Sequence, residues 1–150
     1  MWPISFPFFT VQVTELREDF YVPEYCYTSE EDEEEPHANI WFGPEGTVSP
    51  LHTDPKHNCL CQVFGSKLVR LFPEDQTDLL SPYDGSMLSN TSQVDLTSGY
   101  EAAVKAHPLF AQARGYECTM GPGDLLYIPP KCWHFVQSNS VSCSISFWFN

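Results

Sequence analysis

From residue 38 onward, the chain is a succession of short apolar segments separated by glycine and proline. The clearest of them are NIWFGPEGTVSP, NCLCQVFGSKLVRLF, GDLLYIPPKCWHFV and SVSCSISFWF. Short runs rich in β-branched and aromatic residues, bounded by turn residues, predict strands, and several in succession predict an all-β sandwich or barrel. The stretch at about 99–113, GYEAAVKAHPLFAQA, has helical character, and we expect it to pack outside the sheets as an insertion.

The composition suits one folded domain and narrows the class of partner. The chain has 150 residues, of which 42% are hydrophobic and 15% aromatic, and this is enough for one buried core. The formal net charge of −13 argues against a nucleic-acid surface, which would be basic. We therefore expect a protein or peptide partner that is itself basic, containing arginine or lysine.

The first 37 residues are interpreted as a lead-in to a core at 38–150. The apolar start, MWPISFPFFTVQV, is interrupted by Pro3 and Pro7, lacks a basic flank and is too short to span a bilayer, so neither a signal peptide nor a membrane helix is predicted. The acidic run SEEDEEEP at 29–36 is interpreted as a solvated loop, with a patch that steers a cationic substrate as the alternative. The six cysteines are irregularly spaced, so we expect free thiols and an intracellular location, in the nucleus or cytoplasm.

Gly65 and Ser66 predict a tight turn, because glycine at the first central position suits a type II′ hairpin. In a hairpin closed there, alternation of side chains places Asn58 and Lys67 on one largely apolar face. Burying a lysine among apolar groups is costly unless an anion pairs with it. Lys67 is therefore either an ordinary surface lysine or the partner of a buried anion. The pairs of this register are Phe64 with Lys67, Gln62 with Val69, and Leu60 with Leu71.

The final segment, SVSCSISFWF, alternates hydroxyl and apolar side chains. One face carries Ser142, Ser144, Ser146 and Trp148, and the other carries Val141, Cys143, Ile145 and Phe147. The apolar face predicts core. The serine face predicts either solvent or the wall of a polar cavity, and the large tryptophan at its end favours the cavity.

A possible metal site begins in SPLHTDPKHN, where His52 and Asp54 project to the same side if the segment is extended. The pair alone is a weak signal, and a third ligand must come from the remaining histidines, His37, His57, His107 and His134. We expect His37 and His107 to be exposed, and Pro55 separates His57 from the pair. His134 has apolar and aromatic neighbours on both sides and completes the two-histidine, one-carboxylate triad that holds Fe(II) with open positions.

Four segments, NIWFGPEGTVSPLHTD, MLSNTSQVD, GDLLYIPPKCWH and SISFWF, resemble the JmjC-domain oxygenases in content and order. The branch that they resemble most is known both as JmjC arginyl hydroxylase and as lysine-specific demethylase eight, and the likeness runs from about Glu15 to Asn150. It implies a cupin-type double-stranded β-helix, or jelly roll, that uses Fe(II) and 2-oxoglutarate to oxidise a protein side chain, in some members as a chromatin regulator. Residues 1–14 do not resemble the family, whose members carry further helices and strands there and a tyrosine that contacts 2-oxoglutarate. We therefore expect a shortened chain with weak turnover.

The resemblance also implies roles for single residues. His52, Asp54 and His134 correspond to the metal ligands. Lys67 corresponds to the lysine that pairs with the distal carboxylate of 2-oxoglutarate. Further implied contacts are those of Ser49, Asn58, Ser146 and Trp148 with 2-oxoglutarate, and of Trp41 with the substrate.

The resemblance leaves the reaction open. Hydroxylation of an arginine side chain is the main expectation, and demethylation of N-methyl-lysine in histones, with the same cofactors, is the alternative. A truncated cupin module that binds a peptide without catalysis is the alternative from a different class. A zinc-dependent cupin hydrolase is disfavoured, because Lys67 would have no role in it.

Overall fold

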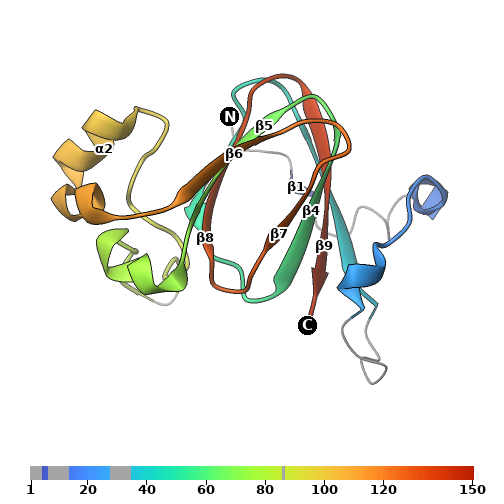
Figure 1. The fold of residues 1–150 in the computed structure, drawn as a ribbon, viewed down its shortest axis with the longest axis horizontal. Coiled ribbons are helices and arrows are strands. Elements are labelled where there is room, and N and C mark those ends of the chain that lie inside the picture. Colours follow the sequence, from blue (N-terminus) through green and yellow to red (C-terminus); the bar gives the residue numbers. More distant parts are fainter. Residues whose placement is uncertain (1–4, 7–13, 28–34, 86) are drawn as a thin grey trace.

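The computed structural model describes residues 5–6, 14–27, 35–85 and 87–150, and these form a mainly β fold (Figure 1). The strands are β1 (Ser5–Phe6), β2 (His37–Gly43), β3 (Val48–His52), β4 (His57–Phe64), β5 (Lys67–Phe72), β6 (Tyr116–Met120), β7 (Leu125–Ile128), β8 (Trp133–Ser138) and β9 (Ser142–Phe149). The described residues also contain one α-helix, α2 (Tyr100–Ala106), and four 3₁₀ helices: η1 (Thr14–Glu18), η2 (Glu24–Cys26), η3 (Glu74–Leu79) and η4 (Pro108–Gln112).

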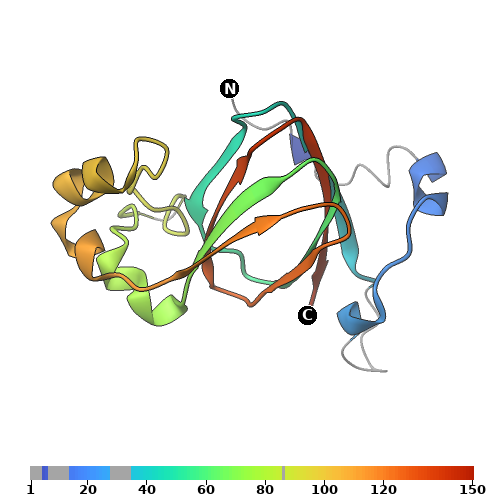
Figure 2. The ribbon, with the colours of Figure 1, turned by 45° about the horizontal axis from the view of Figure 1, so that its top comes forward.

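The strands form two antiparallel sheets, and the predicted jelly roll is confirmed. The first sheet has the order β1-β2-β9-β4-β7 and the second the order β3-β8-β5-β6. Figures 1 and 2 show the two sheets facing each other, with the helical insertion beyond one side and the N-terminal 3₁₀ helices beyond the other. Chain neighbours such as β4 and β5 lie in different sheets, so the chain crosses repeatedly from one sheet to the other.

The outer face of the second sheet is covered by the segment at 73–113. One cluster of buried apolar residues joins the two layers: Leu51, Phe72, Trp133 and Phe135 from the sheet, with Leu80, Val94, Leu96, Ala103 and Phe110 from the covering segment. The insertion predicted at 99–113 is confirmed as α2 and η4. They are separate helices because Pro108 cannot donate the backbone hydrogen bond that would continue α2.

The outer face of the first sheet is also apolar. Cys59, Ile145, Phe147 and Phe149 are buried there together with Cys26, which lies in η2. The ring of Phe20 packs on that of Phe147 at a centroid distance of 5.7 Å. Of the apolar face predicted for the last strand, Ile145 and Phe147 are core, as expected, and Phe20 and Cys26 cover them. The prediction is wrong for Val141, because it precedes β9 and is exposed, and Cys143 is only half-buried.

The space between the sheets has an apolar half and a polar half. Leu60, Val69, Met120 and Ile128 are buried in the apolar half. The serine face of β9 lines the polar half, where Ser142, Ser144 and Ser146 are at most 1% exposed. Ser144 donates a hydrogen bond to Oε1 of Gln62 at 2.7 Å, and Ser142 donates one to Oγ of Ser138 at 3.0 Å. Of the two predictions for this face, the cavity wall is correct and solvent is wrong.

The hairpin predicted at Gly65 and Ser66 is wrong. The strand before the turn, β4, pairs with β7 and β9, and the strand after it, β5, pairs with β6 and β8. The turn therefore carries the chain between sheets and does not join two paired strands. Asn58 and Lys67 nevertheless both face the interior, because each lies on the inward face of its own sheet.

Three sequence expectations concern features outside the sheets. The acidic run at 29–36 lies outside the described residues except for Glu35 and Pro36. All six cysteines are free thiols. Within the described part of the chain, no helix has the length and apolarity needed to cross a membrane.

Candidate metal centre and its pocket

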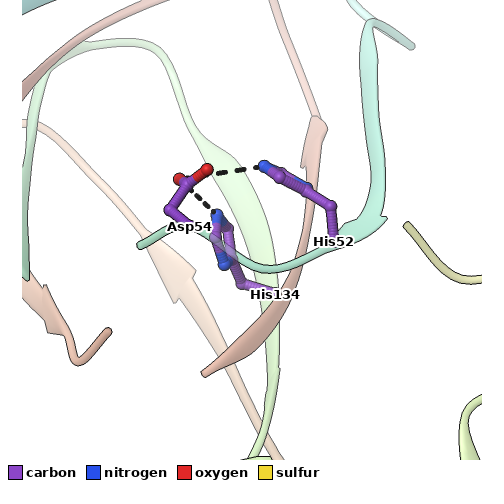
Figure 3. A group of neighbouring side chains, drawn as sticks. All are labelled: His52, Asp54 and His134. Carbon is purple, nitrogen blue, oxygen red and sulfur yellow. Dashed lines mark ion pairs between the residues drawn. The ribbon is translucent and has the colours of Figure 1, made fainter. Parts of the chain in front are cut away.

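His52, Asp54 and His134 converge at one edge of the second sheet (Figure 3). His52 is the last residue of β3 and is paired in register with His134 on β8. Nε2 of His134 lies 3.4 Å from Oδ2 of Asp54, and Nε2 of His52 lies 3.9 Å from the same oxygen. The two imidazole rings lie against each other, with centroids 4.1 Å apart, and the Asp54 carboxylate faces both of them from one side (Figure 3).

Backbone carbonyl groups fix the tautomers of both histidines. Nδ1 of His52 donates to the carbonyl oxygen of Pro50 at 2.6 Å, and Nδ1 of His134 donates to that of Cys132 at 3.0 Å. In both rings Nε2 then carries the free lone pair, and this nitrogen faces Asp54. Metal-binding histidines have this arrangement, in which the second ring nitrogen is held by a carbonyl or carboxylate group.

The local electrostatics favour the protonation states that a metal ion requires. Burial lowers the pKa of His52, and the neighbouring His134 lowers it further. Burial alone would raise the pKa of Asp54, but when the rings are protonated the hydrogen bond from His134 and the positive charges of His134 and His52 hold that pKa below its ordinary value. A neutral imidazole and an ionised carboxylate are the ligand forms of these side chains.

The spacing of the three side chains also suits a metal ion. Bonds of about 2.0–2.2 Å to imidazole nitrogen and carboxylate oxygen allow at most about 4.4 Å between two ligand atoms. The separations of 3.4 and 3.9 Å lie below that limit. Two imidazoles and one carboxylate leave coordination positions open on a six-coordinate ion. Among the described residues this is the one group of three such side chains with ligand atoms this close.

A pocket extends from this group into the polar half of the space between the sheets. Its lining residues include every residue that the sequence assigned to a site: Trp41, Ser49, His52, Asp54, Asn58, Lys67, His134, Ser146 and Trp148. They come from β2, β3, β4, β5, β8 and β9 and from the turn after β3. The structure thus brings together residues that are up to 107 positions apart, Trp41 and Trp148.

Lys67 lies inside this pocket and is only 6% exposed. Its Nζ donates to the backbone carbonyl oxygen of Trp41 at 3.2 Å, an acceptor without formal charge. Burial lowers the pKa of Lys67 to about 8, although the nearby Cys143 opposes the shift. Of the two interpretations left open by the sequence, the surface lysine is therefore excluded.

Two residues that line the pocket each have a buried polar atom without a hydrogen-bond partner. The atoms are Oδ1 of Asn58 and Nε1 of Trp148, an acceptor and a donor. Buried polar groups in folded proteins are normally paired, so an unpaired donor and an unpaired acceptor beside a pocket favour a polar ligand. Together with the cationic Lys67, the N–H of Trp148 suits a small anion that accepts hydrogen bonds, whereas Oδ1 of Asn58 requires a donor.

Ser49, Ser146 and Trp41 occupy the walls of the same pocket. Ser146 is buried and accepts a hydrogen bond from Nε1 of Trp41 at 2.8 Å, whereas Ser49 is half-buried on β3. The indole of Trp41, expected to contact the substrate, therefore touches a residue expected to contact 2-oxoglutarate. The structure does not separate the two functions in space.

The sequence analysis missed several lining residues. Val136 and Ser138 on β8 also line the pocket, together with Thr47, Leu60 and Ile128. Val136 and Ser138 lie two and four residues after His134, so the alternation of side chains along a strand would have identified them. Thr47 precedes β3, and no comparable pattern indicates it.

The other three histidines lie elsewhere. His37 is exposed, as expected. His107 was expected to be exposed, but it is half-buried, because it joins α2 to η4 and makes backbone hydrogen bonds to both helices. His57 stacks on the ring of Phe149 at 5.2 Å and bonds to the hydroxyl of Tyr127.

Comparisons with known proteins agree with the geometry. The profile of a family described as "Cupin-like domain" matches residues 8–150. Lysine-specific demethylase 8 of Xenopus tropicalis is 45% identical over 139 residues, which are 93% of this chain and 31% of that protein. Jumonji C domain-containing protein 5 of Drosophila melanogaster is 46% identical over 92% of this chain and 34% of its own length. Lysine-specific demethylase JMJ30 of Arabidopsis thaliana is 45% identical over 93% and 31%. The chain thus spans about a third of the length of these curated relatives.

Proposed function

The chain belongs to the cupin-like family of JmjC-domain proteins, and on that premise we propose that it is an Fe(II)- and 2-oxoglutarate-dependent protein oxygenase. The observation that carries the proposal is the shared pocket of His52, Asp54, His134 and Lys67. A metal triad alone would suit many reactions. A buried cation in the same cavity adds a place for a small organic anion beside the metal.

Each residue of the pocket has a role in this proposal. His52, Asp54 and His134 hold Fe(II) through Nε2, a carboxylate oxygen and Nε2. Lys67 donates to the distal carboxylate of 2-oxoglutarate in a charge-assisted hydrogen bond, which is about twice as strong as a neutral one. Trp148 supplies an indole N–H that is otherwise unpaired, whereas Asn58 can contact 2-oxoglutarate only through Nδ2, because the ligand has no proton to donate to Oδ1.

The protein itself positions the reactants and excludes water. When bound, Fe(II) and 2-oxoglutarate supply the oxidising chemistry that uses O₂ to insert one oxygen atom into a substrate C–H bond, with succinate and CO₂ as co-products. Leu60, Ile128 and Val136 give the pocket an apolar wall, which strengthens the interaction between Lys67 and an anion. Ser146 receives the indole N–H of Trp41, so its own hydroxyl proton is free to donate into the pocket.

Arginine hydroxylation is the reaction that we propose first. The net charge of −13 supports a basic substrate through electrostatic attraction. The names of two relatives favour the second candidate, demethylation of N-methyl-lysine, because both are called lysine-specific demethylases. The two reactions use the same site and differ in the carbon that is attacked. A location in the nucleus or cytoplasm remains a prediction.

The test supplies the purified chain with Fe(II), 2-oxoglutarate and ascorbate, and offers an arginine-containing peptide and an N-methyl-lysine peptide separately. We expect succinate formation that increases with the arginine peptide, and a peptide mass increased by one oxygen atom. Release of formaldehyde and loss of a methyl group from the other peptide would instead establish the demethylase.

The control variants separate catalysis from folding. His52→Ala removes one proposed ligand and should abolish succinate formation, whereas His107→Gln alters a histidine outside the pocket and should not. If the unaltered chain binds metal and peptide but forms no succinate, the non-catalytic module is the correct alternative.

A further inference from the structure

The turn that carries two of the proposed metal ligands lies at the edge of a sheet. β3 is an end strand, and its register on β8 shifts between Ser49 and His52. The strand ends at His52, so Thr53, the residue between the two ligands, has no partner in the sheet. Any rotation of the peptide groups on either side of Thr53 would change the relative orientation of the His52 and Asp54 side chains.

A single residue of the covering segment holds both backbone polar groups of Thr53. The N–H of Thr53 donates to the carbonyl oxygen of Asn90 at 2.8 Å. Nδ2 of Asn90 donates to the carbonyl oxygen of Thr53 at 3.0 Å. In a paired strand a backbone N–H would bind the carbonyl oxygen of Thr53. Here the side-chain amide of Asn90 supplies that N–H instead.

The neighbours of Asn90 extend the contact along β3. Thr91 forms an isolated β-bridge with His52, and the N–H of Ser92 donates to the carbonyl oxygen of Leu51 at 2.8 Å. These residues belong to MLSNTSQVD, one of the four segments that carry the family resemblance, yet none of them lines the pocket.

We propose that Asn90 is a positioning residue, whose side-chain amide fixes the angle between His52 and Asp54 and thereby sets the affinity of the site for a divalent metal. The inference rests on the proposed function. Asn90 does not touch the metal site, and its amide N–H acts through Thr53, while its Oδ1 accepts a hydrogen bond from Oγ1 of Thr91 at 3.4 Å. Residues behind metal ligands commonly alter metal affinity by about 10- to 100-fold when they are replaced.

The opposite side of the turn is held by one further backbone bond. The N–H of Lys131 donates to the carbonyl oxygen of Asp54 at 2.8 Å. This bond links Asp54 to the loop before His134, and no side-chain change at Asn90 removes it. The turn should therefore stay folded without the Asn90 amide, while the two ligands lose their fixed angle.

The experiment measures Co(II) affinity by calorimetry and Co(II) coordination by visible absorption, in the whole chain. Asn90→Ala removes the amide. Asn90→Asp keeps the size of the side chain but has no N–H to donate. Both retain the backbone carbonyl that binds Thr53. The matched control is Gln93→Ala, because Gln93 donates from Nε2 to the carbonyl oxygen of Pro82 at 3.1 Å in the same segment, away from the ligand turn.

We expect both Asn90 variants to bind Co(II) at least about tenfold more weakly, with an altered absorption spectrum, and Gln93→Ala to bind like the unaltered chain. The unfolding temperatures of the metal-free proteins show whether weaker Co(II) binding results from a general loss of structure. Variants that unfold at lower temperature but keep their Co(II) affinity would show a purely structural role and overturn the inference alone. An unaltered chain that binds no divalent metal would overturn the proposed function and, with it, this inference.

Discussion

Lys67 is a positive charge between two sheets, and its hydrogen bond to an uncharged carbonyl does not compensate for its burial. The cost is visible in the pKa of the amine, which burial lowers to about 8. A bound carboxylate would reverse this effect, because an opposite charge nearby favours the protonated amine. The residue is therefore suited to bind an anion and is sensitive to pH while the pocket holds none.

We predict that the affinity for 2-oxoglutarate is constant below about pH 8 and falls above it, by up to tenfold per pH unit. The sign follows from the amine: it loses its proton as the pH rises through about 8, and binding must then first return that proton. The measurement is a titration of the chain, saturated with Mn(II), by quenching of tryptophan fluorescence, since Trp41 and Trp148 line the pocket.

The control for this titration is Lys67→Met, which keeps the apolar stem without the charge. It should bind about 10- to 100-fold more weakly at neutral pH, in line with the 1.5–3 kcal/mol of a charged hydrogen bond, and should show no fall above pH 8. If the variant shows the same pH profile, a group other than the Lys67 amine causes the loss of 2-oxoglutarate affinity above about pH 8.

For single residues, the sequence correctly predicted the features that depend on a spacing of a few positions. His52 and Asp54 lie two apart, and that spacing alone places both on one side of an extended segment. The rigid tautomers could not be predicted, because they depend on where the carbonyl groups of Pro50 and Cys132 point. Asn90 was part of a recognised segment, but its contact with Thr53 spans 37 positions and exists only in the folded chain.

Among the elements, the turn at Gly65 shows why local signals do not determine topology. Its φ of +69° agrees with the predicted reversal of the chain. A turn between paired strands and a turn between two sheets place the same demand on glycine, so the sequence could not distinguish them. Asn58 and Lys67 were nevertheless correctly placed inside, because alternation operates in each strand separately.

We predict that Gly65→Ala destabilises the protein more than Gly46→Ala does. Both glycines have a similar positive φ, which costs an alanine about 1–2 kcal/mol. At Gly46 an added Cβ meets no atom within 4 Å. At Gly65 it would overlap the carbonyl oxygen of Val141 and lie 2.8 Å from Cα of Ser142, so the β8–β9 turn must move as well.

Urea unfolding of the two variants provides the measurement. A lower midpoint for Gly65→Ala than for Gly46→Ala, with unchanged slope, is the expected result. Equal midpoints would mean that the β8–β9 turn moves without cost, and that the close approach of the two turns does not stabilise the fold.

For the whole molecule, we predict that ligands stabilise the fold by linking the two sheets. The pocket is lined from both sheets, so a bound metal ion and 2-oxoglutarate interact with the folded chain and not with the unfolded one. At about 100 times its dissociation constant a ligand adds about 2.7 kcal/mol to the free energy of unfolding. For a chain of this size the unfolding temperature should then rise by roughly 5–10 °C.

Differential scanning fluorimetry with Mn(II), then with Mn(II) and 2-oxoglutarate, measures this increase. A chelator should reverse it. Succinate, which has the same distal carboxylate but lacks the keto group, is the matched ligand control and should stabilise less. No shift with either ligand would show that the pocket does not bind them in the folded protein.

Both sheets are covered on their outer faces, one by Phe20, Val22 and Cys26 and the other by apolar residues between Leu80 and Phe110. Much of the apolar packing therefore lies outside the pocket, while the polar half of the interior holds the residues proposed for chemistry. Such a scaffold is suited to evolutionary diversification. Substitutions in the pocket change what is bound or oxidised, while the outer layers maintain the fold, so related proteins can acquire different substrates without a new architecture.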